Sequence, residues 1–346
     1  GVAAPVIEGD IRFGTGSDLL QIADGVVAGN VAFGTGQDRL LMAGDAKFSG
    51  RVDFGGQADE LALSGTSSFS GTADFAGGAA AVTLSDKSAF SGRFVDSQNV
   101  AVALEGGTLD LASPTTIASL EVGAKGIIVA TLSKEAGEGS AITVGGNASF
   151  AEGAKLKLRL TDIAAAEGTY TVITAGSLTG ADDLVSDNTL VPFMYDAALA
   201  IEEAAGLVMV DIERKANEDL GLNRAQGAAY DALYAALAED DEVAGVFLGI
   251  TDKDLFRATV AQALPDHAGG AFEGLREIVE RRLAKGRHTI GFRSPFSEEG
   301  PSSDEVLQHV QPDDLLEFGF IPEFIGRLPM QVALRELTQD DLERIV

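Results

Sequence analysis

The segments Phe48-Ser49-Gly50, Phe69-Ser70-Gly71 and Phe90-Ser91-Gly92 repeat one tripeptide at intervals of 21 residues. A second series of phenylalanines recurs at nearly the same interval, at Phe13, Phe33, Phe54 and Phe75. Short alternating segments such as Leu61-Ala62-Leu63 lie between the two series, as expected of strands. A unit of 21 residues cannot bury its own apolar face, whereas stacked units can. The sequence therefore predicts a right-handed parallel β-solenoid in which the phenylalanines stack inward.

Beyond Phe90 the repeat loses its phase, but segments with strand character continue. They include Thr108–Leu111, Ile127–Ala130, Lys155–Leu160 and Thr169–Ile173. Leu207–Ile212 is predicted to be the last strand, which closes the solenoid. The predicted solenoid therefore spans residues 1–213, and the chain is expected to be mainly β.

Charge and composition exclude several classes of function. The chain has 53 acidic and 25 basic residues, a formal net charge of −28, and no cysteine. Nucleic-acid binding needs clustered Lys and Arg, so we expect none. The missing cysteines exclude disulfides, thiolate zinc sites and cysteine nucleophiles. No apolar run approaches the length of a membrane span. The sequence also lacks an initiating Met and a signal peptide, which favours a fragment or a processed product.

Acidic residues recur in the turns of the repeat. Gly14-Thr15-Gly16-Ser17-Asp18 and Gly34-Thr35-Gly36-Gln37-Asp38 resemble the core of the calcium-binding repeat of β-rolls, and Asp59 ends a third, weaker copy. Calcium sites of this kind need tandem copies, so that consecutive turns supply ligands to one ion. Here the copies lie about 20 residues apart, and the fourth has Ala80 in place of the acid. The pattern favours Asp18, Asp38 and Asp59 as turn residues, so no metal is expected. A calcium-stabilised rod is an alternative.

Residues 214–268 change to helical periodicity. Asn223 is the predicted cap of a helix through Leu233 and Leu237, and Thr251 with Asp254 predicts a capping box for a second helix. That helix should end at Leu264-Pro265. Asp266-His267 is not expected to be catalytic, because the chain contains no Gly-x-Ser-x-Gly nucleophile motif.

The repeats, the stretch 155–180 and the sequence Leu264–Glu273 together resemble the passenger part of bacterial autotransporters of the sphingomonad type. The resemblance covers roughly residues 9–273. It implies export to the cell surface or outer membrane, a display or adhesion role with an unknown surface ligand, and no catalysis. It also implies that residues 214–268 connect a passenger to a membrane barrel.

The stretch Ile321–Pro329, with the rest of residues 269–346, resembles the ClpX family of ATP-dependent protein unfoldases, the cytoplasmic AAA+ partners of the peptidase ClpP. The resemblance implies a partial α/β AAA+ fragment. Ile290, Gly291 and Phe292 match the loop that docks on ClpP. Arg327 matches the arginine finger that acts on the nucleotide of a neighbouring subunit. ATP and Mg²⁺ are cofactors of that family.

The tail departs from the ClpX pattern at the motifs that bind ATP and magnesium. The chain has no Gly-x-x-x-x-Gly-Lys-Ser/Thr loop to hold phosphates and no acidic Walker B strand to hold magnesium. Arg327 therefore has no catalytic partner within this chain, and we expect no enzyme activity. The alternative is that the chain acts as a fragment of the ATP-binding subunit ClpX.

The two resemblances overlap at Gly269-Gly270-Ala271-Phe272, which marks a predicted seam between unrelated halves. On this hypothesis, residues 1–268 fold as a unit. A helix over 274–284 would then present Leu275, Ile278, Val279 and Leu283 with no sheet to cover them, and residues 285–346 would pack poorly.

Overall fold

The computed structural model describes residues 5–132, 141–163, 166–238 and 240–263, and in the tail residues 275, 278–279, 281–283 and 309–318. The chain divides into two compact units. The first comprises residues 1–216 with 234–256, and the second comprises residues 217–233 with 257–346.

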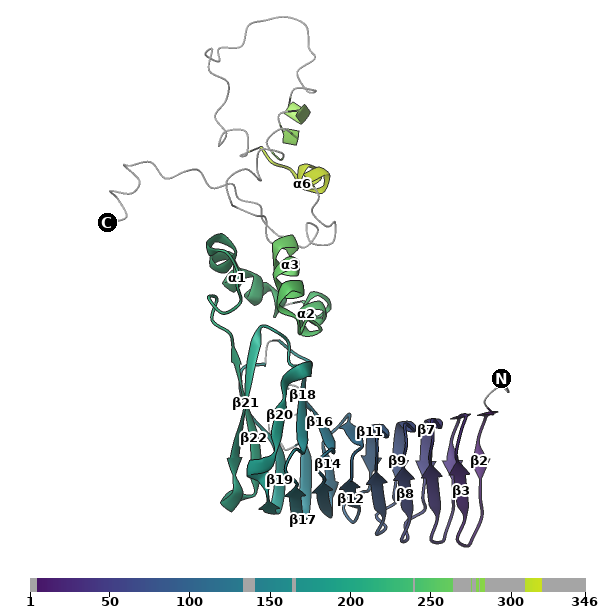
Figure 1. Cartoon of the computed structure of the whole chain (residues 1–346). Helices are drawn as coiled ribbons and strands as arrows, with labels where there is room; N and C mark the ends of the chain where they lie inside the picture. The colour runs from purple at the N-terminus through teal and green to yellow at the C-terminus, as the bar shows by residue number, and fades with distance from the viewer. Residues whose placement is uncertain are drawn as a thin grey trace, which may run out of the picture. The chain divides into compact units, whose positions relative to one another are not determined.

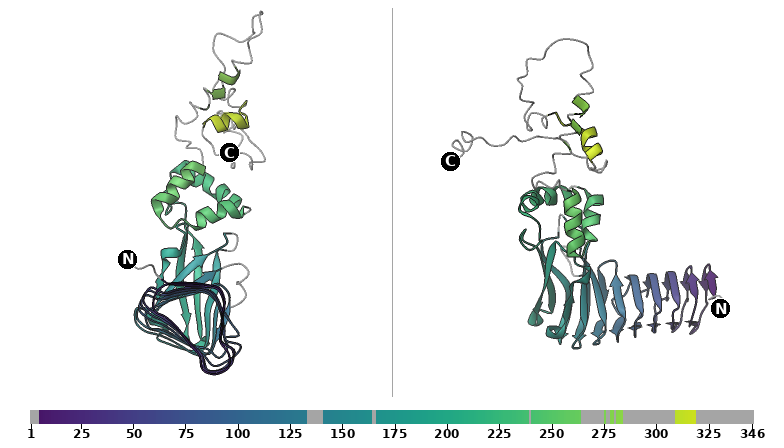
Figure 2. Two further views of the ribbon diagram at one scale, coloured as in Figure 1. Left: turned by 90° about the vertical axis from the view of Figure 1, so that its right-hand side faces the viewer. Right: turned by 45° about the horizontal axis from the view of Figure 1, so that its top comes forward.

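The first unit is built on a parallel β-solenoid, as the 21-residue spacing predicts (Figure 1). One sheet follows the order β1 (Val6–Glu8), β4 (Val26–Ala28), β7 (Lys47–Asp53), β9 (Ser68–Asp74), β11 (Ala89–Val95), β13 (Thr108–Leu111), β16 (Ile127–Leu132), β18 (Lys155–Leu160) and β20 (Val185–Asp187). The short strands β2 (Ile11–Arg12) and β5 (Val31–Ala32) pair with each other, and β5 also pairs with β7. Seen along the stack, successive turns superimpose closely (Figure 2, left).

The second sheet packs the other side of the same core. Its order is β21 (Tyr195–Glu202), β22 (Leu207–Arg214), β19 (Gly168–Thr179), β17 (Ile142–Phe150), β15 (Ser119–Val122), β12 (Ala101–Leu104), β10 (Ala81–Leu84), β8 (Glu60–Leu63), β6 (Arg39–Met42) and β3 (Leu19–Ile22). β14 (Thr115–Ile117) pairs with β17. Like stacks on like in this sheet, as in the columns Leu20–Leu40–Leu61 and Ile22–Met42–Leu63.

Two ladders of phenylalanine rings run through the core. Phe33, Phe54 and Phe75 are 0% exposed, and their ring centroids lie 5.3 Å apart at each step. The second ladder, Phe48–Phe69–Phe90, has spacings of 4.7 and 4.8 Å. The predicted inward stacking is therefore confirmed.

Phe94 lies where both ladders end. It meets Phe75 edge-on, at 83° between the ring planes, and its ring centroid is 4.6 Å from that of Phe90. It occupies the column that Val52 and Ala73 fill in earlier turns. A large ring in a column of small side chains changes the packing at the point where the sequence repeat loses its phase.

The third position of each Phe-Ser-Gly tripeptide requires glycine for a structural reason. Gly50, Gly71 and Gly92 have φ of 148°, 143° and 152°, outside the range that other residues readily adopt. They also stack directly on one another. A Cβ at Gly71 would overlap the carbonyl oxygen of Gly50, and one at Gly92 would overlap that of Gly71. Only glycine fits this column.

The last strands change direction. Leu207–Ile212 lies in β22 as predicted, but β22 pairs antiparallel with both β19 and β21. The purely parallel arrangement expected up to residue 213 is thus wrong for the final hairpin, β21–β22. An antiparallel hairpin needs only a short connection, whereas a parallel return needs a longer crossover.

Helices follow the hairpin. α1 (Arg224–Leu237) has a capping box in which Asn223 and Gln226 bond each other's backbone N–H, which confirms Asn223 as the cap. α2 (Asp241–Leu248) was not predicted, and it is capped by Asp240. α3 (Lys253–Ala263) is capped by Asp252 through the N–H groups of Asp254 and Leu255, so the predicted cap Thr251 is wrong by one residue. α3 ends just before Leu264, as expected.

Within the second unit, α6 (Pro312–Phe318) begins with Pro312, whose fixed φ suits the first position of a helix. None of the described helices is long and apolar enough to cross a membrane.

Candidate functional site

Asp18, Asp38 and Asp59 occupy the same place in three successive turns, just before β3, β6 and β8. Asp38 Oδ1 accepts a hydrogen bond from Asp18 N at 2.8 Å, and Asp59 Oδ1 accepts one from Asp38 N at 2.9 Å. The three residues therefore form a ladder in which the carboxylates of Asp38 and Asp59 each hold the turn before. We call these residues the Asp ladder.

Asp38 and Asp59 of the Asp ladder are buried, and their carboxylates are only partly hydrogen-bonded within the described residues. Asp38 is 0% exposed and Asp59 is 3% exposed. The Oδ2 atoms of all three carboxylates are buried and have no hydrogen-bond partner among the described residues. Burial raises the pKa of Asp59, and the negative charge of Asp38 raises it further. The backbone N–H groups of Asp38 and Gln57 oppose this by lowering it.

The Asp ladder brings together the residues considered as calcium ligands. Their carboxylates follow one another along the stack, one to a turn, and two of the three Oδ1 atoms already accept backbone N–H groups. In the part of the chain that the structure describes, no group of three or more His, Asp or Glu residues could hold a metal ion. That the fold does not require calcium stays a prediction.

A second polar cluster lies at the closing hairpin. The hydroxyls of Tyr195 and Tyr234 are 2.8 Å apart, Tyr234 Oη donates to Glu167 Oε1 at 3.3 Å, and the guanidinium of Arg214 lies 4.6 Å from the centroid of the Tyr234 ring. Burial raises the pKa of the Tyr234 hydroxyl above its usual value. The cluster therefore ties Tyr234 to the closing hairpin.

Lys215 strengthens this junction, because its Nζ reaches the carbonyl oxygens of Phe193 and Tyr195 at 2.9 and 2.6 Å and the Asp196 carboxylate at 2.9 Å. Sequence reasoning missed the junction, because its contacting residues lie 19 to 67 positions apart in the chain.

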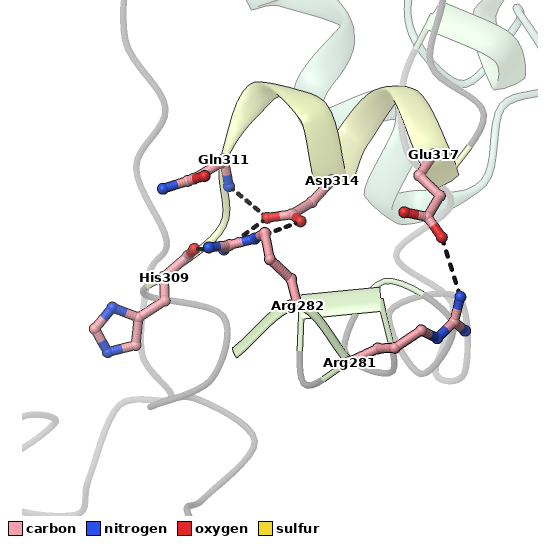
Figure 3. A network of polar contacts seen from close by, with 6 residues as sticks. All are labelled: Arg281, Arg282, His309, Gln311, Asp314 and Glu317. Carbon is pink, nitrogen blue, oxygen red and sulfur yellow. Dashed lines mark hydrogen bonds and ion pairs between the residues drawn. The ribbon is translucent and has the colours of Figure 1, made fainter. Parts of the chain in front are cut away.

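A third cluster lies in the tail (Figure 3). Arg282 Nε and Nη2 donate to the two carboxylate oxygens of Asp314 at 2.7 and 2.9 Å, and Arg282 also contacts the carbonyl oxygen of His309. Gln311 N donates to Asp314 Oδ2 at 2.8 Å. Burial alone would raise the pKa of Asp314, but these hydrogen bonds and the charge of Arg282 lower it overall.

This cluster corrects one expectation about the tail. Leu275 and Val279 are buried at 2% and 0% exposed, in contact with Leu283, Val310, Leu315 and Phe318. The expectation that Leu275 and Val279 would be left uncovered is therefore wrong, because Val310 and α6 pack against them.

The remaining candidate residues lie outside the described part of the chain. These are Ile290, Gly291 and Phe292, which match the ClpP-docking loop, Arg327, which matches the arginine finger, and the seam at 269–272. The structure leaves these assignments as predictions from sequence.

The fold makes the first unit a parallel β-solenoid with buried structural polar clusters. No family model matches the chain, and no solved structure matches it. The chain is 48% identical over 79 residues to the "ATP-dependent Clp protease ATP-binding subunit ClpX" of Treponema denticola, covering 22% of this chain and 19% of the relative.

Two further ClpX proteins are similar to a comparable extent. The protein from Azotobacter vinelandii is 47% identical over 79 residues, covering 23% of this chain and 18% of the relative. "ClpX 3" from Methylococcus capsulatus is 45% identical over 80 residues, with the same coverage of 23% and 18%. The chain thus spans about a fifth of the length of these curated relatives. The similarity confirms the resemblance to ClpX over a short segment.

Proposed function

We propose that the solenoid is an exported, non-enzymatic rod that serves for surface display or adhesion, joined to an inactive ClpX-like fragment. The observation that carries this is the pair of phenylalanine ladders, which fill the core continuously from the first turns to Phe94. A core filled with stacked rings supports a long, stiff surface, as in other solenoid proteins that bind through an extended face.

The polar clusters support a structural role. The Asp ladder ties successive turns together, the tyrosine junction holds Tyr234 to the hairpin, and Arg159 links two strands through Asp110 at 2.9 Å. Each of these groups makes contacts that hold the fold. A rod that presents a surface needs such contacts and no reacting group.

Export is tested by protease treatment of intact cells that make the protein. We expect the solenoid to be detected by antibody before treatment and lost after it, while a cytoplasmic marker stays intact. Protection of the solenoid until the cells are lysed would contradict export and favour a cytoplasmic protein.

The ClpX similarity supports the second candidate, a fragment of the unfoldase that binds ATP or ClpP. The chain lacks the phosphate-binding loop, so we expect neither ATP binding nor hydrolysis by the purified chain. Turnover that disappears in Arg327→Ala would favour the second candidate, because the arginine would then act on a nucleotide site.

ClpP docking is tested with Phe292→Ala as the matched variant. One docking loop gives weak affinity, whereas a ring that presents several loops gains avidity. We therefore expect no measurable difference between the chain and Phe292→Ala in binding to ClpP. A single long sequencing read across the codons for residues 260–280 would show whether one gene encodes both halves.

A further inference from the structure

The outer surface of the first sheet differs in charge from the chain as a whole. Along β7, β9, β11, β13, β16, β18 and β20, every second residue points away from the core, because side chains alternate between the two faces of a sheet. The outward side chains of these strands include six bases and four acids, namely Lys47, Arg51, Arg93, Lys155, Lys157 and Arg159 with Asp53, Asp74, Asp110 and Asp187. The whole chain has 25 bases and 53 acids. We call this surface the basic face.

Most acids of the basic face are already neutralised by its own bases. The ion pairs are Arg51–Asp74, Arg159–Asp110 and Lys157–Asp187. Lys47 and Arg93 are exposed, and neither pairs with an acid in the part of the chain that the structure describes. In-register pairing of β7, β9 and β11 puts these two bases at diagonally opposite corners of a three-strand patch. Two positive charges on the patch therefore lack a counterion.

Hydroxyl side chains fill the patch between the two unpaired bases. Ser49, Ser70 and Ser91 are exposed and stack in register, one to a turn. Ser68 and Thr72 point outward on β9, on either side of Ser70. Neighbouring strands lie ~4.8 Å apart, so the serine row repeats at that interval. Because a hydroxyl both donates and accepts, the row can exchange hydrogen bonds with a ligand that carries hydroxyls at regular intervals.

The basic face is poorly suited to peptide, nucleic-acid or folded-protein partners. Each strand from β7 to β18 pairs on both sides, so a peptide cannot add to these strands as a neighbour. The outward residues of β7, β9 and β11 include no aromatic ring, whereas single-stranded nucleic acid binds by stacking bases on such rings. They also lack the large apolar side chains that form the centre of a protein interface. Charge and hydroxyls are what the patch offers.

We propose that the basic face binds a linear polysaccharide that carries carboxylates, a polyuronate, laid across β7, β9 and β11. Lys47 and Arg93 pair with carboxylates of the ligand, and the guanidinium of Arg93 can bind one through two N–H groups. The serine row bonds the hydroxyls of the sugar rings. This ligand class rests on the proposed adhesion role for its biological use. Binding is measured on the purified chain, so failure of binding and failure of export are separate results.

The probe is a fluorescently labelled hexamer of galacturonic acid, and the measurement is fluorescence anisotropy with the full chain at 0.15 M salt. At this ionic strength charges are screened beyond ~8 Å, so the acids elsewhere on the chain repel the probe little. We expect binding with a Kd below ~1 mM. The methyl-esterified hexamer keeps the sugar rings but lacks the charge, and it should bind at least ~5-fold more weakly.

Substitutions at exposed positions locate the site. Lys47→Gln with Arg93→Gln should weaken binding by at least ~3-fold, the effect of losing two surface ion pairs. Arg39→Gln with Lys253→Gln is the matched control, because it removes the same charges from exposed residues of β6 and α3, and it should not change binding. Replacing Ser49, Ser70 and Ser91 together by Ala keeps the charge and should also weaken binding, by about 3-fold.

Four results would overturn the proposal. They are no binding at ~1 mM hexamer, equal binding of the esterified hexamer, equal loss of binding in the basic-face pair and the control pair, and binding of a hexaglutamate peptide as tight as that of the hexamer. The last result would show that charge alone, without the sugar hydroxyls, accounts for the affinity.

Discussion

The carboxylate of Asp59 accepts the backbone N–H of Asp38, one turn earlier in the solenoid, at 2.9 Å between Asp59 Oδ1 and Asp38 N. Asp38 holds Asp18 in the same way. The contact links consecutive turns outside the strand ladders, but it places like charges close together in a buried position. The Asp ladder thus stabilises the turns through hydrogen bonds and destabilises them through charge.

The unfavourable free energy of the buried Asp59 carboxylate predicts how stability depends on pH. The pKa of Asp59 in the folded chain is raised above 3.8, so the folded state binds more protons than the unfolded state between 3.8 and that raised pKa. The cost is fully present above the raised pKa and is relieved as the pH falls through it. We expect Asp59→Asn to raise the melting temperature at pH 7, because its amide oxygen still accepts from Asp38 N.

The control is Asp45→Asn, the same charge change at an exposed turn residue. Thermal melts of both variants should be measured between pH 4 and pH 7. We expect Asp59→Asn to have a higher melting temperature than the native chain at pH 7, and the difference should become smaller as the pH falls toward 4. A lower melting temperature for Asp59→Asn at pH 7 would mean that its hydrogen bonds need the full carboxylate charge.

Calcium should not be required for the fold. The Asp ladder spreads its carboxylates along the stack, one to a turn. A ligand that binds only the folded state raises its stability, so removal of a bound ion lowers the melting temperature. We expect a chelator to change the melting temperature by no more than about 2 °C, a fraction of 1 kcal/mol for a chain of this size. A larger fall that added calcium restores would identify a calcium-stabilised rod.

Phe54 should be among the most sensitive positions of the core. It is 0% exposed and stacks on a ring at each side, Phe33 and Phe75. Phe54→Ser should cost at least the ~3–5 kcal/mol typical of Phe→Ala in a core, since the hydroxyl is also left without a partner. Phe13→Ser is the control, because Phe13 is only half-buried and stacks on Phe33 alone. Stability is measured by denaturant titration. If Phe54→Ser and Phe13→Ser lost the same free energy of unfolding, the idea that ring stacking in the ladder stabilises the core would be contradicted.

Gly71 should resist substitution for a different reason. Gly71→Ala forces a Cβ onto the carbonyl oxygen of Gly50 at a φ of 143°, so we expect a loss of more than ~2 kcal/mol. Gly245→Ala in α2 is the matched change, because nothing lies within 4 Å of its added Cβ. That change should be neutral or stabilise by up to ~1 kcal/mol, the helix preference for Ala over Gly. Thermal melts of the two variants would decide between a backbone requirement and a general effect of adding a methyl group.

The tail shows where sequence reasoning was too pessimistic. It identified the apolar positions Leu275 and Val279 correctly, but it assumed that only a sheet could cover them. In the structure, Leu315 and Phe318 of α6 pack against them, and Arg282 binds Asp314 beside the contact. Pairing of segments more than 30 residues apart depends on packing that no local pattern records.

The sequence by itself determined the solenoid, its register and the direction of its phenylalanines. A 21-residue period places Phe33, Phe54 and Phe75 in one column, and identical residues stack because each turn meets only its neighbours. Only the tertiary structure decided that β21 and β22 close the sheet antiparallel and that Tyr195 meets Tyr234. The physical reason is that a repeat sets contacts one turn apart, whereas these two depend on local backbone direction and on segments that leave the repeat.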